Sequence, residues 1–154
     1  MSHSDEAILR RGDLRLARLL AERARPGADV RRIDERIWDL FGEEWAIMFT
    51  DLCGFTKQVD AFGIIHFLQV IQEHQEILFP IAIAHDGVLV KIEADSLMLV
   101  FRRAHAALGC AIEMQRACRL ANERRRQDQQ ILLGIGLGFG KILRIGDADV
   151  FGAE

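Results

Sequence analysis

The sequence has few cysteines, no long apolar run and little net charge, and each of these absences narrows what the chain can be. Its three cysteines, Cys53, Cys110 and Cys118, have no metal-ligand spacing, and an odd number argues against a disulfide framework. The longest apolar run, Ile77–Ala84, has eight residues, whereas roughly 20 are needed to cross a bilayer. The N-terminus lacks the apolar core of a secretory signal. We therefore expect a cytoplasmic protein with reduced thiols and no membrane span.

The charge balance and composition are those of an ordinary globular domain. A net charge of −3 over 154 residues gives no reason to expect nucleic acid as a partner. Half of the residues are apolar and 28% are charged, which argues against disorder. The length suits one domain with a short helical extension.

The first part of the chain carries two helix patterns. Apolar residues recur among Arg and Glu over residues 5–25, and Pro26-Gly27 ends the pattern. A second, shorter helix starts with Asp29 as a plausible cap and closes at Gly42. We expect residues 1–42 to form an N-terminal helical extension and residues 43–154 to form the main domain. The apolar stripe of the second helix suits packing on its own domain or pairing with another helix, and both remain open.

From Trp45 onward, strand and helix patterns alternate. We expect a buried strand at 45–51, one or two helices at 59–84, strands at 87–93 and 96–101, a helix from 104 to about 124, and a final strand pair at 131–146 around Gly140-Lys141. Ala94-Asp95 forms a tight hairpin between the second and third strands. This order predicts an α+β fold with a ferredoxin-like βαββαβ core and an added strand. Because that plan hosts many functions, the function has to be argued from the site.

Asp51 ends the first expected strand, and Gly54 marks a sharp turn into the next helix. A carboxylate there lies beside a helix N-terminus, whose N–H groups hold phosphate oxygens. A hard divalent cation bound by the carboxylate neutralises the same phosphates. The alternative is that Asp51 only caps the following helix.

Asp95 lies at the tip of the expected hairpin. In the split βαβ plan this hairpin is next to the end of the first strand, and so next to Asp51. Two converging carboxylates suit a pair of Mg²⁺ ions that also bind substrate phosphates. The alternative is that Asp95 is simply a good turn residue.

Two segments together resemble a known family. FTDLCGFT (Phe49–Thr56), followed some 40 residues later by K-x-x-A-D (Lys91–Asp95), resembles the catalytic domain of class III adenylate and guanylate cyclases. Their usual form is D-x-x-G-F-T and then K-x-x-G-D. The resemblance runs from about Trp45 to the last residue. Arg32–Gly42 also resembles the lead-in of a bacterial subgroup of these domains.

The resemblance implies a metal and phosphate site. Asp51 and Asp95, assisted by the backbone carbonyl of Leu52, would hold two Mg²⁺ or Mn²⁺ ions. The turn that follows would present N–H groups to the triphosphate, and its residues are Cys53, Gly54, Phe55 and Thr56.

The resemblance also implies a substrate and a partner. Lys91 matches the base-reading lysine of adenylate cyclases, and Asp149 matches their second adenine-reading position. The implied reaction converts ATP to cyclic AMP and pyrophosphate. Because the family builds each site between two catalytic domains, a head-to-tail homodimer with a second copy of the chain is implied.

Three departures from the family pattern favour an alternative. Ala94 stands where the family has glycine, and Glu93 adds an unusual carboxylate. The printed sequence ends before the V-N pair and the basic residue that follow D-x-x-G in the family, so we expect a truncated catalytic domain that turns over poorly. The alternative is a catalytically weak, cyclase-like regulatory or nucleotide-binding domain. A diguanylate cyclase is disfavoured because no G-G-D/E-E-F segment occurs at the hairpin.

The glycine-rich stretch GIGLGFGK is not a phosphate loop, since Ile142 follows Lys141 where Ser or Thr is needed. Its four glycines follow a period of two, which is typical of a strand against which another element packs closely. Three histidines, His66, His74 and His85, have no partners at metal-ligand spacing, so surface or capping roles are expected for them.

Overall fold

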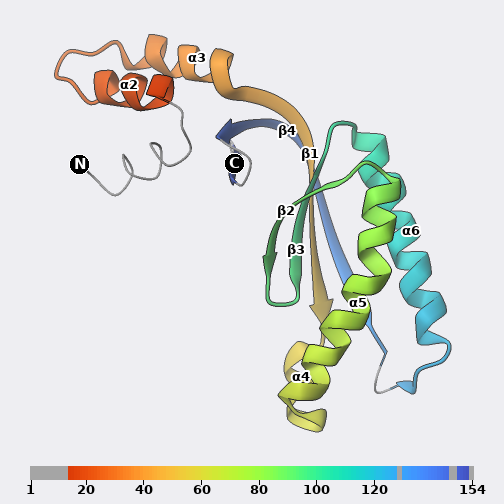
Figure 1. The fold of residues 1–154 in the computed structure, drawn as a ribbon. Coiled ribbons are helices and arrows are strands. Elements are labelled where there is room, and N and C mark those ends of the chain that lie inside the picture. The colour runs from red at the N-terminus through yellow and green to blue at the C-terminus, as the bar shows by residue number, and fades with distance from the viewer. Residues whose placement is uncertain (1–13, 128–129, 146–148, 153–154) are drawn as a thin grey trace. The chain divides into compact units, whose positions relative to one another are not determined.

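The alternating patterns of the sequence become a sheet and a set of helices in the computed structural model (Figure 1). The structure describes residues 14–127, 130–145 and 149–152. The chain divides into two units, one of residues 45–139 and one that joins the residues before 45 to those after 139. No helix among the described residues is long and apolar enough to span a membrane.

The main sheet and its helices follow the expected order. The elements are β1 (Gly42–Cys53), α4 (Phe55–Phe62), α5 (Ile64–Ala84), β2 (Val88–Glu93), β3 (Ser96–Phe101), α6 (Ala104–Asn122), β4 (Leu132–Ile145) and β5 (Asp149–Gly152). The strands lie in the order β2-β3-β1-β4-β5. The α+β, ferredoxin-like βαββαβ core with an added strand is therefore confirmed.

The register of β1 against β3 sets which residues face the core. The two strands pair antiparallel, from Ala46 opposite Phe101 to Thr50 opposite Leu97. Along β1, even-numbered residues from Ala46 to Leu52 are buried, while the odd-numbered Phe49, Asp51 and Cys53 are exposed. Because side chains alternate along a strand, β1 presents its last aspartate and cysteine on the face opposite the core.

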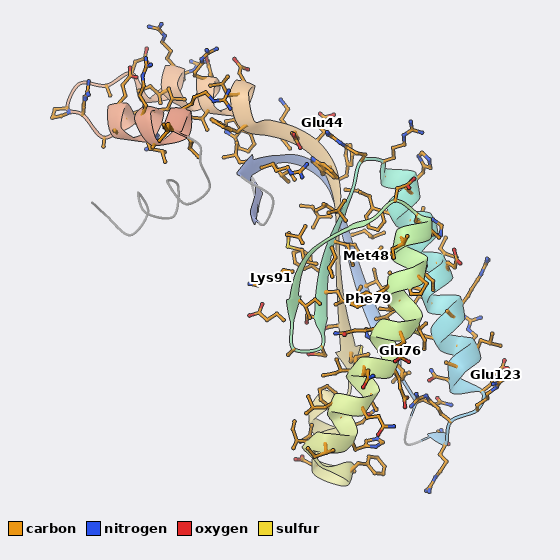
Figure 2. The ribbon with its side chains drawn as sticks, viewed as in Figure 1. Glu44, Met48, Glu76, Phe79, Lys91 and Glu123 are labelled. Carbon is orange, nitrogen blue, oxygen red and sulfur yellow. The ribbon has the colours of Figure 1, made fainter. Side chains whose placement is uncertain are left out.

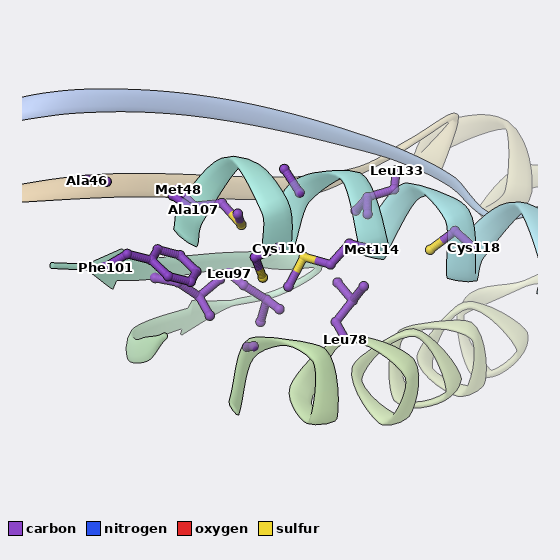
Figure 3. Close-up of a cluster of buried hydrophobic side chains, with 13 residues drawn as sticks. Ala46, Met48, Leu78, Leu97, Phe101, Ala107, Cys110, Met114, Cys118 and Leu133 are labelled. Atoms are coloured by element: carbon purple, nitrogen blue, oxygen red, sulfur yellow. The ribbon is translucent and has the colours of Figure 1, made fainter. Parts of the chain in front are cut away.

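Helices α5 and α6 lie side by side over the core face of the sheet (Figure 1). The hydrophobic cluster between sheet and helices is shown in Figure 3, and its fully buried members include Met48, Leu78, Leu97, Leu99, Phe101, Cys110 and Met114. Burial raises the pKa of the Cys110 thiol to about 11. This thiol and that of Cys118 therefore act as buried apolar groups, and all three cysteines are free.

The segment expected as one or two helices forms two. Gly63, with φ of 83°, closes α4 by donating its N–H to the Val59 carbonyl, and it also stands at the N-cap of α5. A left-handed backbone is accessible to glycine at little cost, so this residue separates the two helices.

The expected strand pair around Gly140-Lys141 is wrong. Residues Leu132–Ile145 form a single continuous strand, and Gly140 does not have the positive φ of a turn glycine. The end of β4 pairs instead with β5, from Ile142 opposite Gly152 to Ile145 opposite Asp149. Glycine adopts extended backbone as readily as a turn, so its presence alone did not locate the chain reversal.

The smaller unit contains a helix pair, α2 (Leu14–Arg23) and α3 (Val30–Phe41). The Asp29 side chain caps α3 by accepting from the Arg32 N–H, as the sequence predicts. The stripe of α3 packs within this unit, in a buried cluster of Leu16, Ile33, Ile37 and Phe41. The expected first helix is confirmed from Leu14 onward, whereas its residues 5–13 lie outside the described part of the chain.

His74 is a polar residue buried in the apolar face of α5. Its side chain is only 1% exposed, and neither ring nitrogen has a hydrogen-bond partner among the residues that the structure describes. Burial lowers the pKa of His74 to about 4, although the charge of Asp95 acts in the opposite direction. His74 is therefore neutral in the folded protein, a core residue rather than the surface or capping group that its sequence indicates.

We expect this burial to make the fold acid-sensitive. Between pH 6.5 and 4 the unfolded chain protonates His74 while the folded chain does not, so the free energy of unfolding should fall by roughly 3 kcal/mol from this group. Urea unfolding across this range should show a shallower pH slope for His74→Leu. The exposed His105 gives the matched control, since His105→Gln should keep the wild-type slope. An unchanged slope in His74→Leu would contradict the assignment.

Candidate active site

Asp51 lies at the end of β1 on the exposed face of the sheet. In the part of the chain that the structure describes, no hydrogen bond or ion pair engages its carboxylate. The N-cap of α4 is Gly54, which makes no side-chain cap bond. Asp51 is therefore not the capping residue that the alternative interpretation required, and its carboxylate is available to a ligand.

Asp95 is tied directly to the strand that carries Asp51. Its Oδ2 accepts a hydrogen bond of 3.0 Å from the Leu52 backbone N–H. The contact joins the tip of the β2–β3 hairpin to the end of β1, as the ferredoxin-like plan predicted. Asp95 is thus more than a turn residue, because a charged acceptor on a backbone N–H orients its own carboxylate.

Gly134 on β4 gives the Asp51 carboxylate its space. A Cβ on Gly134 would stand 2.4 Å from Asp51 Oδ1 and 3.5 Å from Cys53 Sγ. No side chain other than hydrogen fits there without moving the carboxylate. The sequence pattern does not predict this role, although glycines with a period of two are its signal. The close packing expected along all four glycines is confirmed only here, since Gly136, Gly138 and Gly140 have no atom within 4 Å of such a Cβ.

The turn after Asp51 starts α4 in the expected way. Gly54 has φ of 79°, in the left-handed region, and accepts from the Gln58 N–H at 3.1 Å. Cys53 is exposed on the same face as Asp51. The side chains of Phe55 and Thr56 lie outside the described residues, although both residues belong to the first turn of α4.

The two expected base-reading residues lie in different units. Lys91 is exposed on β2, and its Nζ lies 3.4 Å from Glu93 Oε2. Asp149 begins β5 in the smaller unit, and its side chain is outside the described residues.

The carboxylates of Asp51 and Asp95 suit a hard divalent cation that also binds the phosphates of a substrate. Among the described residues, no group of three or more His, Cys, Asp or Glu side chains is placed to hold a metal ion. Mg²⁺, however, is commonly bound by one or two carboxylates together with substrate phosphates. The room that Gly134 leaves for Asp51, and the fixed orientation of Asp95, agree with such a site.

The sequence is similar to two curated proteins over about two thirds of its length. No family model matches the sequence. The chain is 28% identical over 107 residues to the protein named "Putative adenylate cyclase 3" of Rhizobium meliloti, a match that covers 70% of this chain and 18% of that protein. It is also 28% identical over 102 residues to a serine/threonine-protein kinase, pkn2, of Myxococcus xanthus, with coverage of 66% and 12%. The chain thus spans less than a fifth of either relative.

Solved structures share the fold. The adenylate/guanylate cyclase/hydrolase from Silicibacter pomeroyi aligns with a TM-score of 0.66 and 28% identity, over 72% of this chain and 64% of that one. Other solved adenylyl and guanylyl cyclases match at lower identity and support the fold alone.

Ala94 is strained where it enters the hairpin turn. Its φ of 53° lies in the left-handed region, which costs a residue with a Cβ roughly 1 kcal/mol. Ala94→Gly should therefore stabilise the fold by about 0.5–1 kcal/mol in urea unfolding. The same substitution at the exposed Ala61 in α4 should destabilise it by a similar amount, because glycine is a poor helix former. Destabilisation by Ala94→Gly would contradict the strain at this turn.

Proposed function

We propose that this chain, which has the fold of the class III nucleotide cyclase catalytic domain, is an adenylate cyclase domain. The reaction would convert ATP to 3′,5′-cyclic AMP and pyrophosphate by attack of the ribose 3′-hydroxyl on the α-phosphate. The observation that carries the proposal is the hydrogen bond from Leu52 N–H to Asp95, which holds the second carboxylate at the end of the strand that bears Asp51. The similarity to an adenylate cyclase sequence supports the same activity.

Asp51, Asp95 and the Leu52 carbonyl would bind two Mg²⁺ or Mn²⁺ ions. When bound, such ions lower the pKa of a hydroxyl and neutralise phosphate charge. The chain's own contribution is to orient the ligands. Because Gly134 has no side chain, the Asp51 carboxylate keeps its position, and the Leu52 N–H orients the carboxylate of Asp95. In a reaction within one substrate molecule, such positioning and charge neutralisation are most of what the protein supplies.

The turn from Cys53 to Thr56 would hold the triphosphate. Because the N-cap of α4 supplies no side-chain acceptor, the first N–H groups of the helix are suited to phosphate oxygens. Left-handed Gly54 has no side chain to obstruct that approach.

Lys91 and Asp149 would select adenine. The Lys91 ammonium would donate to the ring nitrogen N1, and the Asp149 carboxylate would accept from the exocyclic amine. The family resemblance implies a head-to-tail homodimer, in which the metals and triphosphate would lie on one copy and the base-reading residues on the other. We therefore propose a second copy of this chain as the partner.

A second candidate is a nucleotide-binding regulatory domain with little turnover. The observation that favours it is the pairing of Lys91 with Glu93, because this lysine is already engaged by a carboxylate. The strained backbone of Ala94, beside Asp95, also favours the regulatory domain.

Removal of either proposed metal-binding carboxylate should strongly reduce catalysis. Asp51→Asn and Asp95→Asn should each lower cyclic AMP formation from ATP and Mn²⁺ by about a hundredfold or more relative to wild type. Asp60→Asn, an exposed carboxylate on α4, should retain activity within about twofold of wild type, since it lies outside the site.

The outcomes separate the two candidates. Cyclic AMP formation that survives both substitutions would refute the metal assignment. An inactive wild type that still binds ATP in the presence of Mn²⁺ would favour the regulatory domain.

The space beside Asp51 gives a second test, with a matched pair of glycines on one strand face. Gly134→Ala should displace the Asp51 carboxylate and weaken Mn²⁺-dependent ATP binding about tenfold or more, with little loss of stability because a carboxylate rotates easily. Gly136→Ala meets open space and should bind as wild type does. Isothermal titration measures both affinities. Equal affinities in the two variants would show that Asp51 does not contribute to the site.

A further inference from the structure

Lys91 and Glu93 lie on the same face of the sheet as Asp51. Lys91 is opposite Met98 and Glu93 is opposite Ser96 in the β2–β3 pairing. The residues that alternate with these on β3, Leu97 and Leu99, are buried in the core, so Met98 and Ser96 face the other way. Figure 2 shows Lys91 pointing away from α5 and α6.

The two side chains form an ion pair that leaves both of them accessible. Nζ and Oε2 are 3.4 Å apart, and the side chains are 62% and 76% exposed. An exposed pair of this kind contributes little to stability. Its consequence is chemical, because a charged donor and a charged acceptor stand together at the expected base-reading position.

The two purines present different hydrogen-bond donors and acceptors to such a pair. Adenine presents an acceptor at N1 beside a donor amine, and a lysine alone satisfies the acceptor. Guanine presents N–H donors at N1 and at its amine, and a lysine alone would oppose donor with donor. A carboxylate beside the lysine accepts from those donors while the lysine donates to the guanine oxygen O6. Loss of such an opposing contact is a common route to relaxed specificity.

We propose that Glu93 is a specificity-determining residue that allows the site to bind guanine as well as adenine nucleotides. This inference rests on the proposed function, since it concerns the base of the same nucleotide. It also gives the Lys91–Glu93 contact a role in substrate choice, in place of the simple inhibition that the regulatory alternative would assign to it.

The test compares ATP and GTP binding to the chain in the presence of Mn²⁺ by isothermal titration. Glu93→Ala should weaken GTP binding about tenfold and leave ATP binding equal or stronger, because Lys91 is released. The ratio of the two affinities is the readout that a merely structural role would not move. Glu35→Ala is the matched control, as it removes the carboxylate of another exposed ion pair, with Arg31 at 3.2 Å, and should leave the ratio unchanged.

Asp95→Asn separates this inference from the proposed function. If Asp95→Asn weakens the binding of both nucleotides while Glu93→Ala leaves their ratio within about twofold of wild type, Glu93 has no part in base choice and the proposed function stands. A wild type that binds ATP at least a hundredfold tighter than GTP would also overturn the inference. If wild type shows no Mn²⁺-dependent binding of either nucleotide, the proposed function fails and the inference fails with it.

Discussion

The hydrogen bond between Asp95 and the Leu52 N–H is the contact on which the candidate site depends. It joins the β2–β3 hairpin to the end of β1 across 43 residues of sequence. The antiparallel pairing of β1 with β3 makes it possible, because Thr50 opposite Leu97 brings the strand end level with the hairpin. A shift of that pairing by one residue would turn Asp51 into the core and remove it from Asp95.

The same pairing separates the core from the site. Alternate residues of β1 and β3 pack under α5 and α6, and Asp51 lies on the other face of β1. Gly134 extends this arrangement to β4, where the missing side chain makes room for the Asp51 carboxylate. The candidate site therefore places neither Asp51 nor Cys53 in the hydrophobic core. Two polar side chains are buried among the described residues, Thr50 and His74, and neither the Thr50 hydroxyl nor the His74 ring has a hydrogen-bond partner there.

Much of this could be predicted from local pattern. A strand that carries Asp51, the Ala94-Asp95 hairpin, the capped helix after Asp29 and the ferredoxin-like order follow from periodicity and turn chemistry, and the structure confirms them. The strand itself extends past its expected bounds of 45–51 and runs from Gly42 to Cys53. Helical spacing continues on both sides of Gly63, so the sequence does not decide between one helix and two. The end of β4 was predicted wrongly, since Gly140 and Lys141 suit a turn and an extended strand equally well.

By itself, the sequence determined the kinds of element and the residues with chemistry to offer: two aspartates at chain reversals, a lysine four residues before the second, and glycines with a period of two. The tertiary structure alone decided which of these meet. It placed Asp95 on the Leu52 N–H and Gly134 against Asp51. Periodicity reports only on neighbours along the chain. Contacts between distant segments depend on strand register and packing, which are settled when the whole core forms.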